Sequence, residues 1–217
     1  MKIKLFSSSL LAVGLLISSN ASATVLDFEG LGLSIYQSIP QTYGDNTGTT
    51  PNVEVSYSVV DGSGNPHLTE SVEYWGSSYG DLSGVAFSGA NGWFAKITLT
   101  PDSGFDVILN SFDMAGYPQT DLALDSLEVV SGSGVQLWDS GVTTILGAGP
   151  TRSSFSPNIT SSGPISIIWG TNWNIGIDNI DFSQRPTQTG IAVPEPTTLA
   201  LLGLGLAGLG FQRMRRY

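Results

Sequence analysis

The middle of the chain is predicted to fold as an all-β domain, an antiparallel β-sandwich of the jelly-roll kind. Apolar and polar residues alternate there in many short runs, and turns rich in glycine and proline separate the runs. Nothing in residues 24–186 has a convincing helical period. Many short strands at regular spacing are typical of sandwiches, and about 165 residues suffice for one domain with its own core.

The expected strands follow one another along the chain. They are residues 25–30, 53–60, 93–100, 105–109, 122–130, 135–138, 165–169 and 175–182. The turns between them include residues 61–66, 101–104, 131–134 and 147–150, where glycine allows a positive φ and proline presets the turn.

Charge and composition exclude several classes of function. Residues 24–193 contain three basic and 17 acidic side chains, a net charge of −14, and this repels phosphate backbones. We therefore expect no nucleic-acid partner. The chain has no cysteine, so disulfides, thiolate metal sites and cysteine nucleophiles are absent. Its single histidine, His67, would have to serve any catalytic triad.

The first residues have the pattern of a signal peptide. Lys2 and Lys4 precede the apolar residues 10–17, and Ala21 and Ala23 provide small side chains at the cleavage positions. The alternative is an N-terminal membrane anchor, but the apolar run is too short to span a bilayer comfortably. We expect cleavage after Ala23, and hence export across the inner membrane.

The last residues combine three features in a fixed order. The motif Val193, Pro194, Glu195 and Pro196 comes first, and the wholly apolar run 199–211 follows it. The basic side chains Arg213, Arg215 and Arg216 end the chain. We expect the apolar run to form a single hydrophobic helix that anchors the chain transiently in the inner membrane, with the arginines on the cytoplasmic side.

This order of features resembles the PEP-CTERM sorting signal of Gram-negative bacteria. The resemblance implies that a membrane protease, exosortase, recognises the tail as a transient partner and cuts near Pro-Glu-Pro. It also implies a setting of exopolysaccharide production and a destination in the cell envelope or extracellular matrix. An ordinary single-span anchor is the alternative. The chain thus divides into a signal peptide (1–23), a β-sandwich domain (24–186), a linker (187–193) and a sorting and anchor segment (194–217).

Two short segments of the domain carry a second resemblance. The first reads Val-Leu-Asp-Phe-Glu-Gly at residues 25–30, and the second reads Ile-Gly-Ile-Asp-Asn-Ile-Asp-Phe at residues 175–182. The pair resembles the opening and closing strands of jelly-roll domains such as carbohydrate-binding modules and MAM domains. The resemblance implies that these strands are neighbours and that a structural cation, often calcium, lies between their acids.

The acids of these segments are candidate ligands for Ca²⁺. Asp27 and Glu29 are two residues apart, so on one strand they would point to the same face. Asp178 is expected to share the core face with Ile180 and Phe182, and a buried carboxylate needs a partner. Either Ca²⁺, which takes roughly six to eight oxygen ligands, or backbone N–H groups of a neighbouring loop would provide one.

Aromatic side chains in loops are the candidate ligand-binding residues. Trp75 lies in a stretch rich in glycine and serine that is expected to be a loop, and Trp173 lies between Asn172 and Asn174. Exposed rings of this kind can stack on sugars, with amides bonding the hydroxyls. The alternative is that they pack in the core, as large aromatics commonly do in sandwiches.

No catalytic residues are predicted. His67 is expected in a surface turn, and Glu70 and Glu73 at a solvated strand edge or loop. The expected function is therefore that of an exported, non-catalytic envelope or matrix protein, with exopolysaccharide as its candidate ligand. The alternatives are a glycan-active hydrolase and a purely structural or adhesive matrix protein with no glycan ligand.

Overall fold

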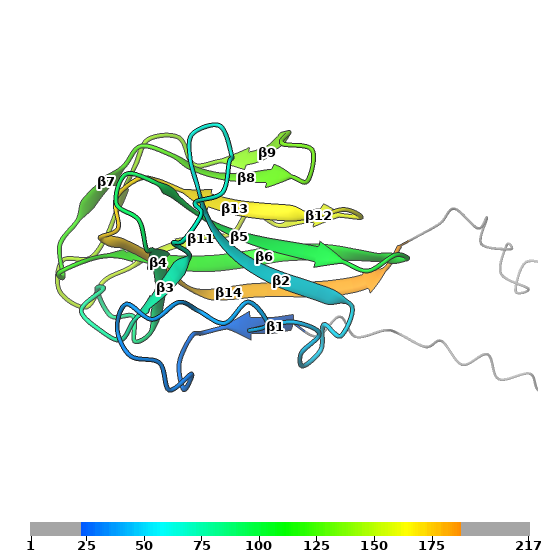
Figure 1. Ribbon diagram of the computed structural model, residues 1–217, viewed down its shortest axis with the longest axis horizontal. Helices are drawn as coiled ribbons and strands as arrows, with labels where there is room; N and C mark the ends of the chain where they lie inside the picture. The colour runs from blue at the N-terminus through cyan, green and yellow to red at the C-terminus, as the bar shows by residue number, and fades with distance from the viewer. Residues whose placement is uncertain (1–22, 188–217) are drawn as a thin grey trace, which may run out of the picture. The chain divides into compact units, whose positions relative to one another are not determined.

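The computed structural model describes residues 23–187, and this part of the chain folds into β-strands and the loops between them (Figure 1). The strands are β1 (Ala23–Leu26), β2 (Val53–Val60), β3 (Val72–Trp75), β4 (Val85–Ser88), β5 (Phe94–Pro101), β6 (Phe105–Gly116), β7 (Leu122–Leu124), β8 (Leu127–Ser131), β9 (Gln136–Asp139), β10 (Thr143–Ile145), β11 (Ser153–Phe155), β12 (Ile159–Ser161), β13 (Ile165–Trp169) and β14 (Ile175–Pro186). The predicted all-β fold is confirmed. Residues 23–187 contain no candidate membrane-spanning helix.

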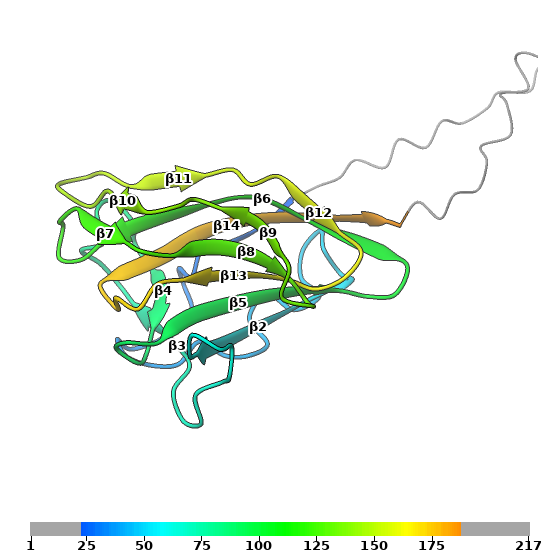
Figure 2. The same ribbon diagram turned by 90° about the horizontal axis from the view of Figure 1, so that it is seen from above.

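Two antiparallel sheets make up the sandwich. The seven-stranded sheet has the order β11-β6-β14-β4-β3, with β1 also paired to β14 and β12 to β6. The five-stranded sheet has the order β2-β5-β13-β8-β9, and Figure 2 shows these strands side by side. Strand β1 lies along β14 from Ala23 opposite Ser183 to Leu26 opposite Ile180. The first and last strands are therefore neighbours, as the resemblance implies.

Alternation along the strands builds the core between the sheets. On β5, Ile97 and Leu99 are fully buried, whereas Lys96 and Thr98 lie on the opposite face. Large buried side chains come from both sheets and include Phe112, Met114, Leu109 and Phe182 from one and Trp169, Ile97 and Leu99 from the other. A sheet with one face on the core and one toward solvent gives this pattern. The outer face of the five-stranded sheet is the one that carries the candidate site.

The strand boundaries agree with the sequence prediction in some places and differ in others. The predicted strands 53–60 and 165–169 coincide with β2 and β13. Residues 122–130 are predicted as one strand but form β7 and β8, with Asp125 and Ser126 between them. Strands β3, β4, β10, β11 and β12 were not predicted; each has only three or four residues, too few for alternation to be recognised.

Candidate functional site

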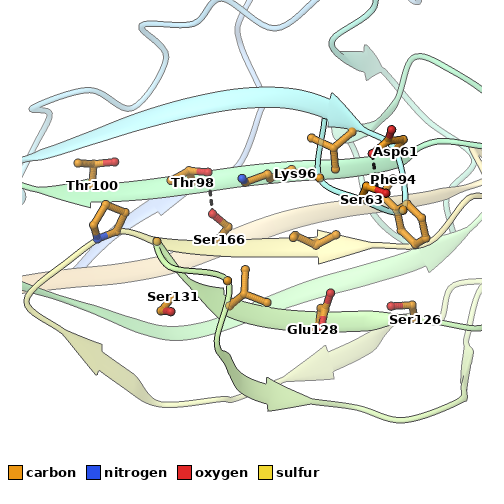
Figure 3. A pocket seen from close by; sticks show the side chains of 18 residues that line it. Asp61, Ser63, Phe94, Lys96, Thr98, Thr100, Ser126, Glu128, Ser131 and Ser166 are labelled. Carbon is orange, nitrogen blue, oxygen red and sulfur yellow. Dashed lines mark hydrogen bonds between the residues drawn. The ribbon is translucent and has the colours of Figure 1, made fainter. Parts of the chain in front are cut away.

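A groove lies on the outer face of the five-stranded sheet, over strands β5, β13 and β8 (Figure 3). Its volume is ≈ 690 Å³, which is within the range of ligand sites. The floor is formed by outward-pointing residues of the three strands: Phe94, Lys96, Thr98 and Thr100 of β5, Ser166 and Ile168 of β13, and Glu128 and Val130 of β8. The outward positions of the three alternating strands form the floor, and the turns at its two ends enclose it.

Hydroxyl groups dominate the middle of the groove floor. Thr98 and Ser166 are register partners on β5 and β13, and their hydroxyl oxygens are 2.8 Å apart. Either hydroxyl can donate to the other, so the pair keeps one O–H donor and unused lone pairs, with Thr98 the half-buried member and Ser166 the buried one. Thr100 adds a third hydroxyl from the next outward position of β5. The floor thus offers hydrogen bonds while Ile168 and Val130 offer apolar contact.

A capped turn bounds one end of the groove. The Asp61 carboxylate accepts N–H bonds from Ser63 at 2.8 Å and Asn65 at 2.9 Å, and these bonds hold the turn in shape. The amide and N–H donors of Asn65 lower the pKa of Asp61. Phe94 lies beneath this turn, next to Gly62. The other end is bounded by the turn at residues 131–134 and by Pro164, whose carbonyl accepts the N–H of Gly132 at 2.7 Å.

The two tryptophans predicted to bind a ligand lie together, in a separate aromatic cluster. Trp75 is not in a loop, as predicted, but ends β3, because residues 72–75 pair with β4. Its ring contacts Tyr36 edge-on at a centroid distance of 4.9 Å and Tyr117 at 5.1 Å. The Trp173 ring lies 6.5 Å from Tyr36. Trp75 is thus half enclosed by other rings.

The outer part of this cluster is open to solvent. Trp173 is 40% exposed and Tyr36 is 51% exposed, and Trp75, Tyr79 and Tyr117 lie beneath them in a small pocket. Tyr36 has a φ of +65°, rare for a bulky residue, and its N–H donates to the Tyr74 carbonyl at 3.0 Å. The backbone that carries the Tyr36 ring is therefore tied to β3.

The predicted metal ligands lie in one acidic region, but not on one strand. Strand β1 ends at Leu26, and Phe28 has a φ of +50°, so the predicted extended run through Asp27 and Glu29 is wrong. Phe28 turns its ring into the core, where it is fully buried. Asp27 accepts the N–H of Glu29 at 3.2 Å in the resulting turn, and Glu29 accepts the Ser83 hydroxyl.

Asp178 is buried as predicted, with 2% of its surface exposed. Its carboxylate accepts the N–H of Asn179 at 2.7 Å. Burial raises the pKa of Asp178 to about 8 despite this bond, which lowers it. The negative charges of Asp27, Glu29 and Asp113 raise it further. A cation would relieve this repulsion, but within residues 23–187 no three His, Cys, Asp or Glu side chains are arranged to hold a metal. The Ca²⁺ site therefore stays a prediction.

A backbone irregularity explains why Asp178 is followed by asparagine. Asn179 has a φ of +51°, a conformation that asparagine tolerates better than most residues. Ile177 and Ile180 are both fully buried, a spacing of three that strict alternation would not give. The Asn179 amide also donates to Asp113 at 3.1 Å, so this residue links β14 to β6.

His67 has its Nδ1 nitrogen occupied. That atom accepts the N–H of Glu70 at 3.0 Å, and the ring packs edge-on against Trp93 at 4.5 Å. A nitrogen that accepts a backbone N–H cannot also take a proton from a nucleophile. This arrangement holds the turn that follows β2.

Sequence reasoning did not find the groove. Its floor comes from segments separated by up to about 70 residues, and Lys96, Glu128 and Ser166 each look like ordinary solvent positions of a strand. The available signal was the series Lys96, Thr98 and Thr100, three polar side chains on one face of one strand.

Two other groups of predicted residues lie outside the described residues. They are the cleavage residue Ala21 and the sorting residues Val193, Pro194, Glu195, Pro196, Arg213, Arg215 and Arg216. Ala23 begins β1.

Comparison with known proteins identifies the tail. The family model described as "PEP-CTERM protein-sorting motif" matches residues 192–216. The chain therefore carries a PEP-CTERM sorting motif, which implies export and exosortase-dependent sorting at the envelope. No curated protein matches the sequence significantly.

Several solved structures are similar in fold, all at low TM-scores. An Arthrobacter globiformis T6 isomalto-dextranase complexed with panose is 11% identical, with a TM-score of 0.33 over 61% of this chain and 23% of that one. The chain thus spans about a quarter of that enzyme. A family 29 carbohydrate-binding module from Piromyces equi is 12% identical, with a TM-score of 0.27 over 61% and 90% of the two chains. A family 11 module from Clostridium thermocellum, in complex with a mixed-linked tetrasaccharide, is 15% identical, with a TM-score of 0.26 over 76% and 96%. Likenesses this weak do not determine a ligand.

Proposed function

We propose that the exported domain is a non-catalytic carbohydrate-binding component of the cell envelope or extracellular matrix. In this proposal exosortase processes the tail after transient inner-membrane anchoring, and the domain then holds exopolysaccharide. The observation that carries the proposal is the groove on the five-stranded sheet, with its hydroxyl floor and the Phe94 ring at one end.

The chemistry of the groove suits a sugar chain. Sugars present hydroxyl groups around the ring and apolar C–H faces above and below it. The Thr98–Ser166 hydroxyl pair and Thr100 can exchange hydrogen bonds with the former, while Phe94 and Ile168 can pack against the latter. The groove lies on the outer face of the sheet between two turns, so it suits a few sugars of a chain that lies against this face.

The arrangement does not favour hydrolysis. Glycoside hydrolysis uses two carboxyl groups on opposite sides of the scissile bond. Two acids line the groove, Asp61 and Glu128. The Asp61 carboxylate is engaged by Ser63 and Asn65, and its pKa is lowered, which is opposite to what a general acid needs. We therefore propose binding without catalysis.

The aromatic cluster at Tyr36, Trp75 and Trp173 is a second candidate site for the same function. The exposed rings of Tyr36 and Trp173 can stack on a sugar, and Asn174 lines the same pocket. The pocket here is only ≈ 50 Å³, so it suits a single sugar at a chain end rather than a polymer.

Replacing Phe94 by Ala is expected to weaken binding to the producing cell's own exopolysaccharide by about tenfold or more, because aromatic anchors contribute strongly to binding. Affinity gel electrophoresis of the exported protein, with the polymer cast in the gel, measures this. Trp173→Ala is the matched aromatic variant in the other site and is expected to have the smaller effect.

The outcomes separate the alternatives. Loss of retention in Trp173→Ala alone would move the site to the aromatic cluster. If the polymer in the gel does not retain the unmodified protein at all, the alternative that remains is a structural or adhesive role without a glycan ligand. Release of sugars from the polymer would instead favour the glycan-active hydrolase.

A further inference from the structure

The basic side chains of the domain differ in what they contact. Arg152 pairs with Asp81 at 3.4 Å and Asp113 at 3.2 Å, and Arg185 pairs with Asp106 at 3.1 Å. Lys96 is the third basic residue between positions 23 and 187, and it makes no ion pair with any residue of that range. In a domain with so large an excess of acids, an unpaired lysine is notable.

Lys96 is located in the groove. It occupies an outward position of β5, opposite Ser58 on β2 and Ile168 on β13. Figure 3 shows its side chain along the floor between Phe94 and Thr98, with the amino group toward Thr98. The residue is partly buried, so its charge is less well screened by solvent than that of a surface lysine. An anionic group on a ligand would pair with it there.

The groove also restricts how many negative charges a ligand can carry. Glu128 is the β8 partner of Ile168, so it lies two strands, or about 10 Å, across the floor from Lys96. Asp61 stands at the end of the groove. A polymer with an acid on every sugar would bring carboxylates next to these two acids and would be repelled. Neutral sugars, by contrast, can donate O–H hydrogen bonds to the Glu128 carboxylate.

We propose that the groove selects a sparsely acidic polysaccharide, in which neutral sugars separate the carboxylate-bearing ones and one carboxylate pairs with Lys96. This inference rests on the proposed carbohydrate binding and names the class of polymer. A charge-assisted hydrogen bond of this kind is about twice as strong as a neutral one, so the carboxylate sets the preference while the hydroxyls and Phe94 hold the chain.

The test uses the producing cell's exopolysaccharide in two forms, native and carboxyl-reduced by carbodiimide activation and borohydride. Reduction converts uronates to neutral sugars and leaves every linkage unchanged. The exported protein is expected to bind the native polymer about tenfold more tightly than the reduced one. Alginate, in which every sugar is a uronate, serves as the densely acidic polymer and is expected to bind more weakly than the native polymer.

Two variants assign the preference to Lys96. Lys96→Gln is expected to bind the native and reduced forms equally, whereas Lys96→Arg keeps the preference because it keeps the charge. Both change a position on the outer face, so thermal unfolding is expected to stay close to that of the unmodified protein.

The outcomes distinguish this inference from the proposed function. Equal binding of both polymer forms by the unmodified protein overturns the inference but leaves carbohydrate binding in place, and so does a preference that persists in Lys96→Gln. Tighter binding of alginate than of the native polymer contradicts the requirement for sparse charge. Binding to neither form of the polymer removes the proposed function itself.

Discussion

Replacing Asp178 by Asn is expected to stabilise the protein at pH 8 in the absence of divalent cations, by about 2 kcal/mol or more. In the folded protein the pKa of Asp178 is raised to about 8 from its ordinary value of 3.8. Between these two pH values the folded state keeps a proton that the unfolded state has released. Stability therefore falls as pH rises through this window, by up to about 1.4 kcal/mol per pH unit.

Asparagine has no proton to lose and can still accept the N–H of Asn179. Urea unfolding of the variant at pH 5 and pH 8, with chelator present, should thus show a much smaller pH dependence than that of the unmodified protein. Asp61→Asn is the control, because the pKa of Asp61 is lowered and its removal cannot stabilise the protein at pH 8. A variant Asp178→Asn that is less stable than the unmodified protein at pH 8 under chelation would contradict this account.

Added Ca²⁺ tests the predicted metal site with the same two proteins. If a cation pairs with Asp178, Asp27 and Glu29, Ca²⁺ will raise the melting temperature of the unmodified protein and leave Asp178→Asn unchanged. Calorimetric melting with Ca²⁺ and with chelator measures both. Identical melting temperatures for the unmodified protein in the two conditions would rule out a stabilising cation.

The second large effect is expected from Trp169→Ala, which should lower the free energy of unfolding by about 3–5 kcal/mol. Trp169 is fully buried behind the groove, and its indole N–H donates to the Ile175 carbonyl at 3.2 Å. Alanine would leave a cavity and an unpaired carbonyl. Trp169→Phe keeps most of the ring and should cost less. Urea unfolding of both variants measures the difference. A decrease in the free energy of unfolding below about 1 kcal/mol for Trp169→Ala would mean that neighbouring side chains fill the cavity, contrary to this prediction.

Much of the fold could be predicted because alternation and turn chemistry are local. Strands β2 and β13 follow directly from their residue patterns, and the turn at residues 61–66 follows from its glycines, its proline and the capping aspartate. The pairing of β1 with β14 was accessible only through a resemblance, since no local rule joins residues so far apart in the chain.

The remaining features depend on contacts that sequence spacing does not encode. The left-handed φ of Phe28 takes Asp27 and Glu29 off the strand, and the irregularity at Asn179 shifts the alternation of β14. Burial of the ring stabilises the conformation of Phe28, whereas the conformation of Asn179 also depends on a residue type that tolerates a positive φ. The groove arises from the register between β5, β13 and β8, so Lys96 and Glu128 could not be related before the pairing was known.

Carbohydrate binding in the groove can be tested directly by backbone-amide NMR of the exported protein during titration with fragments of the native exopolysaccharide. If the groove binds the polymer, the largest chemical-shift changes will fall on β5, β13 and β8, at Lys96, Thr98, Ser166 and Glu128, and changes at Trp173 will be smaller. Shift changes confined to Tyr36, Trp75 and Trp173, or no changes at saturating fragment, would contradict binding in the groove.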